Sequence, residues 1–155
     1  TNQYRGYIQS WQNGDPSWSG LHAFARYQTD DNLYVASIRY DGLTTIKRKL
    51  AGAYTTLAQT TLPNSYLDSN GNLKTGQWFT MKFSVFGSQL KFSLDGTQLL
   101  TATDSNLTFG TIGIRTDYAN IYFDDWKLLS TNPEPSSALL MLTAIGLLGT
   151  GRRRR

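Results

Sequence analysis

The chain has 155 residues, of which 13% are aromatic and 17% are charged, and it contains no cysteine, so disulfides and thiolate metal sites are excluded. Its net charge of +4 arises at the C-terminus, because without the four final arginines and the single glutamate, eleven basic residues face ten acidic ones. The body is therefore nearly neutral and lacks the broad basic surface that a nucleic-acid partner would need.

The first half of the chain has the composition of short strands separated by turns. Its opening residues, 4–11 (YRGYIQSW), already resemble a strand, and the printed sequence starts at Thr1 rather than at an initiator methionine. We therefore expect the C-terminal part of a longer product, with a domain truncated at its N-terminus, and a processed chain is the alternative. Four more candidate strands follow, at residues 20–28, 32–40, 43–50 and 53–62. Asp-Asp-Asn, Asp-Gly and Ala-Gly turns separate them.

The second half contains the clearest alternating pattern. Residues 77–86 (QWFTMKFSVF) and 88–96 (SQLKFSLDG) alternate apolar and polar positions, which is typical of strands with one buried face. Turns are predicted at residues 86–89 and 95–96. Three further strands are expected at 97–103, 110–116 and 120–129, and residues 62–76 form the one long loop. The predicted inward positions are Phe79, Met81, Phe83, Val85, Leu90, Phe92 and Leu94.

About ten short strands, with no helical pattern before residue 130, predict an all-β fold, either an antiparallel sandwich or a barrel. The composition shifts around Ser130 and Pro133. We therefore divide the chain into a β domain at residues 1–130 and a separate tail at residues 131–155.

The tail has three parts in a fixed order. Pro133, Glu134 and Pro135 come first and keep the chain extended. An apolar run then begins at Ala138 and ends at Gly151, which is short for a bilayer span. The chain closes on four arginines, which would hold this end on the cytoplasmic side of a membrane. They are Arg152, Arg153, Arg154 and Arg155.

This order resembles the PEP-CTERM sorting signal of exported proteins in Gram-negative bacteria. The resemblance implies a short apolar helix that enters the inner membrane transiently, followed by recognition and removal of the tail by an exosortase. It also implies a final location at the cell surface or in the extracellular polysaccharide matrix. An ordinary tail anchor is the alternative interpretation.

The body offers little catalytic chemistry. Glycoside hydrolysis commonly needs two carboxylates, yet the body has no glutamate, and its Asp candidates are Asp30 with Asp31, Asp117, and Asp124 with Asp125. Adjacent strand residues face opposite ways unless a bulge intervenes. A Ser-His-Asp arrangement would require His22, the single histidine, which we interpret instead as a half-exposed structural residue. We predict that this domain is not an enzyme.

Metal sites are also weakly indicated. The loop DSNGNL at residues 68–73 departs from the calcium-loop pattern and is interpreted as a turn. Asp124 or Asp125 is a candidate ligand of a structural calcium ion. We expect no other cofactor.

The aromatic residues favour sugar binding, because sugars present flat C–H faces to aromatic rings and hydroxyls to polar side chains. Tyrosines and arginines recur in the candidate strands, and curved sheets would bring them onto one concave face. The alternative is that the tyrosines belong to the core. The predicted carbohydrate-binding residues are Arg26, Tyr34, Arg39, Tyr40, Arg115 and Tyr118.

Most of residues 18–129 also resemble the laminin-G-like, or concanavalin A-like, jelly roll. The resemblance rests on the order of an Arg-Tyr strand, an Asn-Leu-Tyr strand, a Gly-Gln-Trp strand, a Leu-Asp-Gly hairpin and a Gly-Thr-Ile-Gly strand. It implies an antiparallel sandwich of a superfamily that contains both binders and enzymes, so the fold leaves function open.

The sequence therefore predicts an exported protein that binds a polysaccharide, with an exosortase as the partner of its tail. Two alternatives remain. One is a glycan-degrading enzyme or its accessory domain, and the other is a structural matrix or adhesion protein without a specific ligand.

Overall fold

The computed structural model describes residues 1–12 and 17–129, and within them the chain forms ten strands in two five-stranded antiparallel sheets. The all-β prediction is confirmed. The strands are β1 (Asn2–Trp11), β2 (Gly20–Thr29), β3 (Asn32–Arg39), β4 (Leu43–Leu50), β5 (Ala53–Thr61), β6 (Trp78–Phe86), β7 (Gln89–Leu94), β8 (Thr97–Thr103), β9 (Thr111–Asp117) and β10 (Ala119–Leu128).

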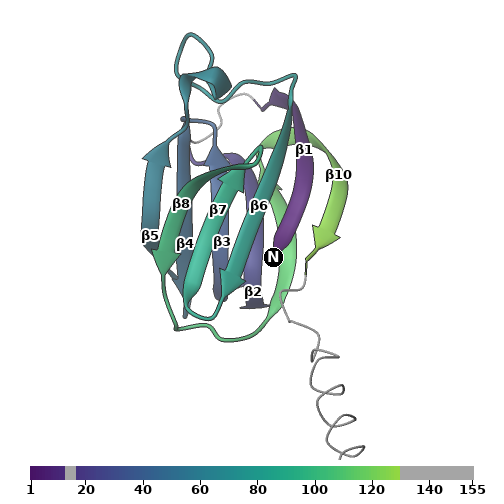
Figure 1. The fold of residues 1–155 in the computed structure, drawn as a ribbon. Coiled ribbons are helices and arrows are strands. Elements are labelled where there is room, and N and C mark those ends of the chain that lie inside the picture. The colour runs from purple at the N-terminus through teal and green to yellow at the C-terminus, as the bar shows by residue number, and fades with distance from the viewer. Residues whose placement is uncertain (13–16, 130–155) are drawn as a thin grey trace, which may run out of the picture.

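The two sheets pack face to face as a sandwich (Figure 1). Sheet A has the strand order β10-β1-β6-β7-β8, and sheet B has the order β5-β4-β3-β2-β9. The chain crosses between the sheets from β1 to β2, from β5 to β6, from β8 to β9 and from β9 to β10. These crossings bring β1 beside β6 and β10, strands that are distant from it in sequence. The core lies between the sheets and is built from apolar side chains of both.

The alternating pattern decides which side chains enter this core. Phe79, Met81 and Phe83 on β6 are fully buried, as are Leu90, Phe92 and Leu94 on β7, so the predicted inward faces are confirmed. Val85 is half-buried against the same core. Because the polar residues between them point outward, each strand has one dry and one wet face.

The predicted hairpins also form. Strand β6 pairs with β7 from Phe86 opposite Gln89, and β7 pairs with β8 across Asp95 and Gly96. Both of these turn residues have positive φ, 48° and 84°. That combination is the geometry of the tight hairpin turn for which Asp-Gly is the usual sequence.

The long loop contains a single turn of 3-10 helix, η1 (Asn64–Tyr66), and no other helix occurs in the part of the chain that the structure describes. Asp68 Oδ1 accepts hydrogen bonds from the backbone N–H groups of Asn70 and Asn72. The carboxylate therefore closes its own turn, as expected of Asp in a loop.

A buried polar network joins sheet B to the loop after β8. The carboxylate of Asp104 accepts hydrogen bonds from the Tyr34 hydroxyl at 2.5 Å and from Arg48 Nη1 at 2.6 Å. It also accepts them from the backbone and side chain of Asn106, and Leu107 N donates to the Tyr34 hydroxyl. The network fixes this loop against β3 and β4.

Gly20, at the start of β2, is required by close packing. A Cβ built on it would lie 2.1 Å from the carbonyl oxygen of Ile38, which is backbone and cannot swing away. We expect Gly20→Ala to lower the free energy of unfolding by about 1–3 kcal/mol, the usual cost of forcing extra atoms into a packed site.

Chemical denaturation would measure this effect, with Gly113→Ala on the neighbouring strand β9 as its control. A Cβ on Gly113 meets nothing closer than Phe24 Cδ2 at 3.5 Å, an ordinary contact. Equal stability changes for the two variants would contradict the packing argument.

Among residues 1–12 and 17–129, no helix is long and apolar enough to cross a membrane. The predicted C-terminal apolar helix lies outside the described residues.

Candidate functional site

A pocket of about 470 Å³ lies on the outer face of sheet B. Its side chains occupy the strand positions that alternate with core residues such as Leu21, Ala23 and Ile38. All five strands of sheet B contribute, together with the segment before β2. The lining residues are Trp18, His22, Phe24, Val35, Ser37, Arg39, Thr45, Lys47, Tyr54, Arg115 and Asp117.

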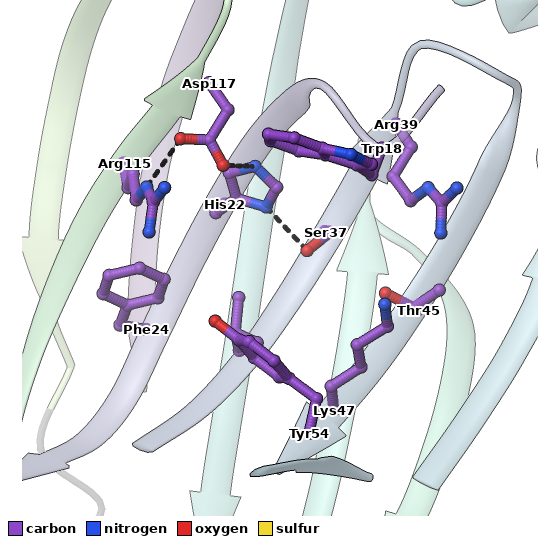
Figure 2. Close-up of a pocket in the computed structure, with 11 residues that line it drawn as sticks. Trp18, His22, Phe24, Ser37, Arg39, Thr45, Lys47, Tyr54, Arg115 and Asp117 are labelled. Carbon is purple, nitrogen blue, oxygen red and sulfur yellow. Dashed lines mark hydrogen bonds and ion pairs between the residues drawn. The ribbon is translucent and has the colours of Figure 1, made fainter. Parts of the chain in front are cut away.

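Two exposed aromatic side chains lie at opposite ends of the pocket, with the polar residues between them (Figure 2). Trp18 is 43% exposed and Tyr54 is 55% exposed. Exposure of large aromatic side chains beside a pocket is the usual feature of a surface that contacts a ligand. Figure 2 also shows Arg115 and Asp117 on one side of the pocket and Arg39 and Thr45 on the other.

A chain of polar contacts crosses the pocket floor. Ser37 Oγ and His22 Nδ1 are hydrogen-bonded at 2.7 Å, and His22 Nε2 lies 3.3 Å from Asp117 Oδ2 without hydrogen-bond alignment. Arg115 Nε donates to the other oxygen of Asp117 at 2.6 Å. Burial alone would raise the pKa of the Asp117 carboxyl, but its contacts with His22 and Arg115 outweigh burial and lower that pKa.

This chain has the residue types of a Ser-His-Asp triad, yet its surroundings differ from those of a hydrolase. Ser37 is buried within β3, between β2 and β4, so the sheet ladders take up the backbone N–H groups that would form an oxyanion hole. Asp117 is also the only carboxylate among the described lining residues. We therefore interpret these polar contacts as a network that fixes the side chains of His22 and Asp117 in place.

On the other side of the pocket lie Arg39 and Lys47, on neighbouring strands. Arg39 Nη2 is paired with Asp41, whose other oxygen accepts a hydrogen bond from Leu43 N. Burial and the nearby Arg39 charge lower the pKa of the Lys47 ammonium, while Asp41 partly offsets them. The pocket thus combines aromatic faces, fixed donors and acceptors, and positive charge.

The structure places two of the six sequence-predicted binding residues in this pocket, Arg39 and Arg115. Tyr118 lies next to it, because its ring packs edge-on against Trp18 with the centroids 5.3 Å apart. Tyr40 instead packs against Trp11 at 5.1 Å and does not line the pocket.

The other two predicted residues serve the fold. Tyr34 is 0% exposed and belongs to the core network, so it offers no surface to a ligand. Arg26 reaches away from the pocket and donates hydrogen bonds to the backbone oxygens of Leu107 and Gly87. The backbone at Arg26 has a φ of 48° at an irregularity in the β2 pairing, and this irregularity redirects its side chain.

Sequence reasoning missed Trp18, Lys47 and Tyr54 as site residues, and it interpreted His22 as half-exposed whereas the residue is buried in the pocket floor. The alternation of side chains along a strand could have identified some of these positions. His22 and Phe24 on β2, like Ser37 and Arg39 on β3, alternate with apolar inward residues and therefore share the outer face of the sheet.

The acidic pair on β10 lies outside the pocket. A bulge does occur there, opposite Gln3 and Arg5, and Asp125 has a φ of 53°. Asp125 is 3.5 Å from Arg5, and Asp124 accepts a hydrogen bond from the Asp125 backbone. No group of three or more His, Cys, Asp or Glu side chains suited to a metal occurs among the described residues. Calcium at Asp124 or Asp125 stays a prediction.

Comparison with solved structures identifies proteins that share this fold. The carbohydrate-binding module CBM66 from Bacillus subtilis aligns with a TM-score of 0.63 at 20% identity, covering 81% of this chain and 72% of its own. Galectin LEC-6 of Caenorhabditis elegans aligns with a TM-score of 0.56 at 13% identity, covering 82% and 81%. Sheep galectin-11, solved with glycerol, gives 0.54 at 11% identity, covering 79% and 86%. At these identities the likeness concerns the fold.

Comparison with curated protein sequences finds no match. Comparison with family models matches residues 133–155 to the PEP-CTERM protein-sorting motif. The chain therefore carries a PEP-CTERM sorting motif behind an antiparallel β-sandwich with the jelly-roll fold of carbohydrate-binding modules and galectins.

Proposed function

We propose that this protein is exported and binds a carbohydrate in the pocket on the outer face of sheet B. The observation that carries the proposal is the pocket itself, in which Trp18 and Tyr54 flank a fixed set of polar groups. Its volume of about 470 Å³ falls within the range of roughly 300–1,000 Å³ typical of small-molecule sites. The fold, shared with carbohydrate-binding modules and galectins, supports the same conclusion.

The sorting motif supports the place where this binding would occur. A PEP-CTERM motif indicates export, and we infer that an exosortase recognises residues 133–155 and removes the tail. The mature protein would then stay at the surface of a Gram-negative cell or in its polysaccharide matrix. Mass spectrometry of the exported protein tests this step, since a C-terminus that still carries Arg152 to Arg155 would contradict it.

Binding itself is tested with a glycan array followed by calorimetry on the ligands found. We expect Trp18→Ala and Tyr54→Ala each to weaken binding by about 10-fold, because a ring stacked on a ligand contributes roughly 0.5–1.5 kcal/mol beyond the area it buries. Both side chains are already exposed, so we expect the melting temperature to change little.

The matched control is Trp78→Ala, which removes a partly exposed tryptophan from sheet A on the opposite face. Unchanged affinity for this variant, with loss in the other two, supports the pocket. Loss of affinity in Trp78→Ala alone would place the ligand on sheet A and overturn the assignment to the pocket on sheet B. Release of reducing sugar by the wild-type protein would instead show a glycan-degrading enzyme.

A further inference from the structure

The pocket has more positive than negative charge. Three cationic side chains line it, Arg39, Lys47 and Arg115, against the single carboxylate of Asp117. Arg115 is paired with Asp117, and Arg39 is paired with Asp41. Lys47 has no ion-pair partner among the described residues, and its pKa is lowered by burial and by the Arg39 charge. One half-buried ammonium group therefore faces the pocket, and the nearest anion that partly offsets its charge, Asp41, is already paired with Arg39.

Two further donors beside Lys47 are also unused. Arg39 Nε and Thr45 Oγ1 are buried and have no hydrogen-bond partner among the described residues, and Thr45 is only 1% exposed. A buried polar atom without a partner is costly, and in a pocket such an atom can gain its partner from a ligand.

These donors lie close together on one face of two paired strands. Thr45 on β4 lies opposite Ser37 on β3, and Lys47 lies opposite Val35. Arg39 is two residues beyond Ser37 on β3, so its side chain is on the same face of sheet B. Three donors, two of them cationic, thus converge on one side of the pocket, and Trp18 and Tyr54 lie at its ends (Figure 2). Charged donors arranged in this way match a carboxylate or a sulfate better than a neutral hydroxyl.

We propose that this pocket selects an acidic sugar, whose carboxylate or sulfate is held by Arg39, Thr45 and Lys47 while the sugar ring contacts the flanking aromatics. The proposal rests on the proposed function and names its ligand class. Exported matrix glycans that carry uronic acids would be ligands of this kind, and uncharged glycans would bind weakly.

Calorimetry with matched ligands tests the charge directly. The probes are trigalacturonate, its fully methyl-esterified form, neutral galactotriose and a sulfated galactose trisaccharide. We expect the free acid to bind about 10- to 100-fold more tightly than its methyl ester, since hydrogen bonds to charged groups are worth more than neutral ones. The preference is expected to shrink as salt is raised, because ions screen partly exposed charges. The sulfated probe separates a general anion site from one shaped for a carboxylate.

Variants then assign the preference to residues. Lys47→Gln is expected to weaken uronate binding about 10-fold and neutral-sugar binding much less, whereas Lys47→Arg retains the preference for the acid. Thr45→Val removes the hydroxyl at nearly constant side-chain shape, and it is expected to lower the affinity for the acidic sugar more than the affinity for the neutral sugar. Lys82→Gln, which removes an exposed charge from sheet A, is the matched control and is expected to change neither the affinity for the acidic sugar nor that for the neutral sugar.

The outcomes separate this inference from the proposed function. Equal affinity for the free acid and its methyl ester overturns the acidic-sugar inference while carbohydrate binding stands. No binding to any sugar, charged or neutral, overturns both. Equal loss of neutral and acidic binding in Lys47→Gln would show that Lys47 does not hold the acidic group, and Thr45→Val gives the same test if Lys47→Gln folds poorly.

Discussion

Replacing Asp104 with alanine is expected to lower the free energy of unfolding by about 3–5 kcal/mol, the usual cost of removing one partner from a buried charge pair. The carboxylate accepts hydrogen bonds from Arg48, Tyr34 and Asn106, and the Arg48 and Asp104 side chains are 19% and 7% exposed. Without it, the guanidinium and the phenol hydroxyl would stay buried with no anion to accept from them.

The same network predicts acid sensitivity. Burial opposes ionisation of Asp104, but the hydrogen bonds from Tyr34 and Asn106 and the charge of Arg48 outweigh it and lower its pKa. A carboxyl whose folded pKa is depressed stabilises the fold above its unfolded value, about 3.9, and this stability is lost as the pH falls toward the lower folded pKa. The wild-type protein should therefore lose stability below about pH 4, and Asp104→Ala should lose less over that range.

Urea denaturation at pH 7 and at pH 3 measures both effects. Asp31→Ala is the matched control, because the Asp31 side chain in its pair with Lys49 is 65% exposed, and ion pairs open to solvent contribute about 0–1 kcal/mol. A stability loss for Asp104→Ala no larger than that of the control would mean that the buried network contributes little.

Strand parity explains why the fold was predictable and the site only partly so. The alternation on β6 and β7 identifies each inward residue without any knowledge of the partner strands, and the structure confirms those positions. The binding residues chosen from sequence mixed the two faces of one strand. Tyr34 and Arg39 differ by an odd number of positions on β3, so one points into the core and the other outward.

Other site residues could not be derived from local pattern. Arg26 has the same parity as His22 on β2, but the irregularity at residues 25–27 turns it away, and no composition signal marks that bulge. Trp18, Lys47 and Tyr54 come together only because sheet B orders its strands β5-β4-β3-β2-β9. Within sheet B, β2 to β5 pair with their neighbours in sequence and only the pairing of β2 with β9 is long-range, but the strand pattern alone does not determine which strands share a sheet.

Arg39→Ala is expected to weaken carbohydrate binding by about 10- to 100-fold, since hydrogen bonds to charged groups contribute roughly 1.5–3 kcal/mol. Arg39 lines the pocket with a buried Nε that has no partner among the described residues, and its Nη2 is held by Asp41. The guanidinium is therefore oriented before a ligand arrives, which reduces the entropy that binding would cost. Arg39→Lys should recover only part of the affinity, because an ammonium lacks the planar fork.

Arg26→Ala is the informative comparison, because both arginines have the same chemistry and both were predicted from sequence. Arg26 holds the β6–β7 hairpin and the loop before β9 through backbone oxygens, and it does not line the pocket. We expect Arg26→Ala to lower the melting temperature with affinity unchanged, and Arg39→Ala to lower affinity with little change in melting temperature. Calorimetry and thermal melting on both variants check this. Loss of binding in Arg26→Ala at full stability would place the ligand at the hairpin end of the sandwich, and the pocket on sheet B would then have to be abandoned as the site.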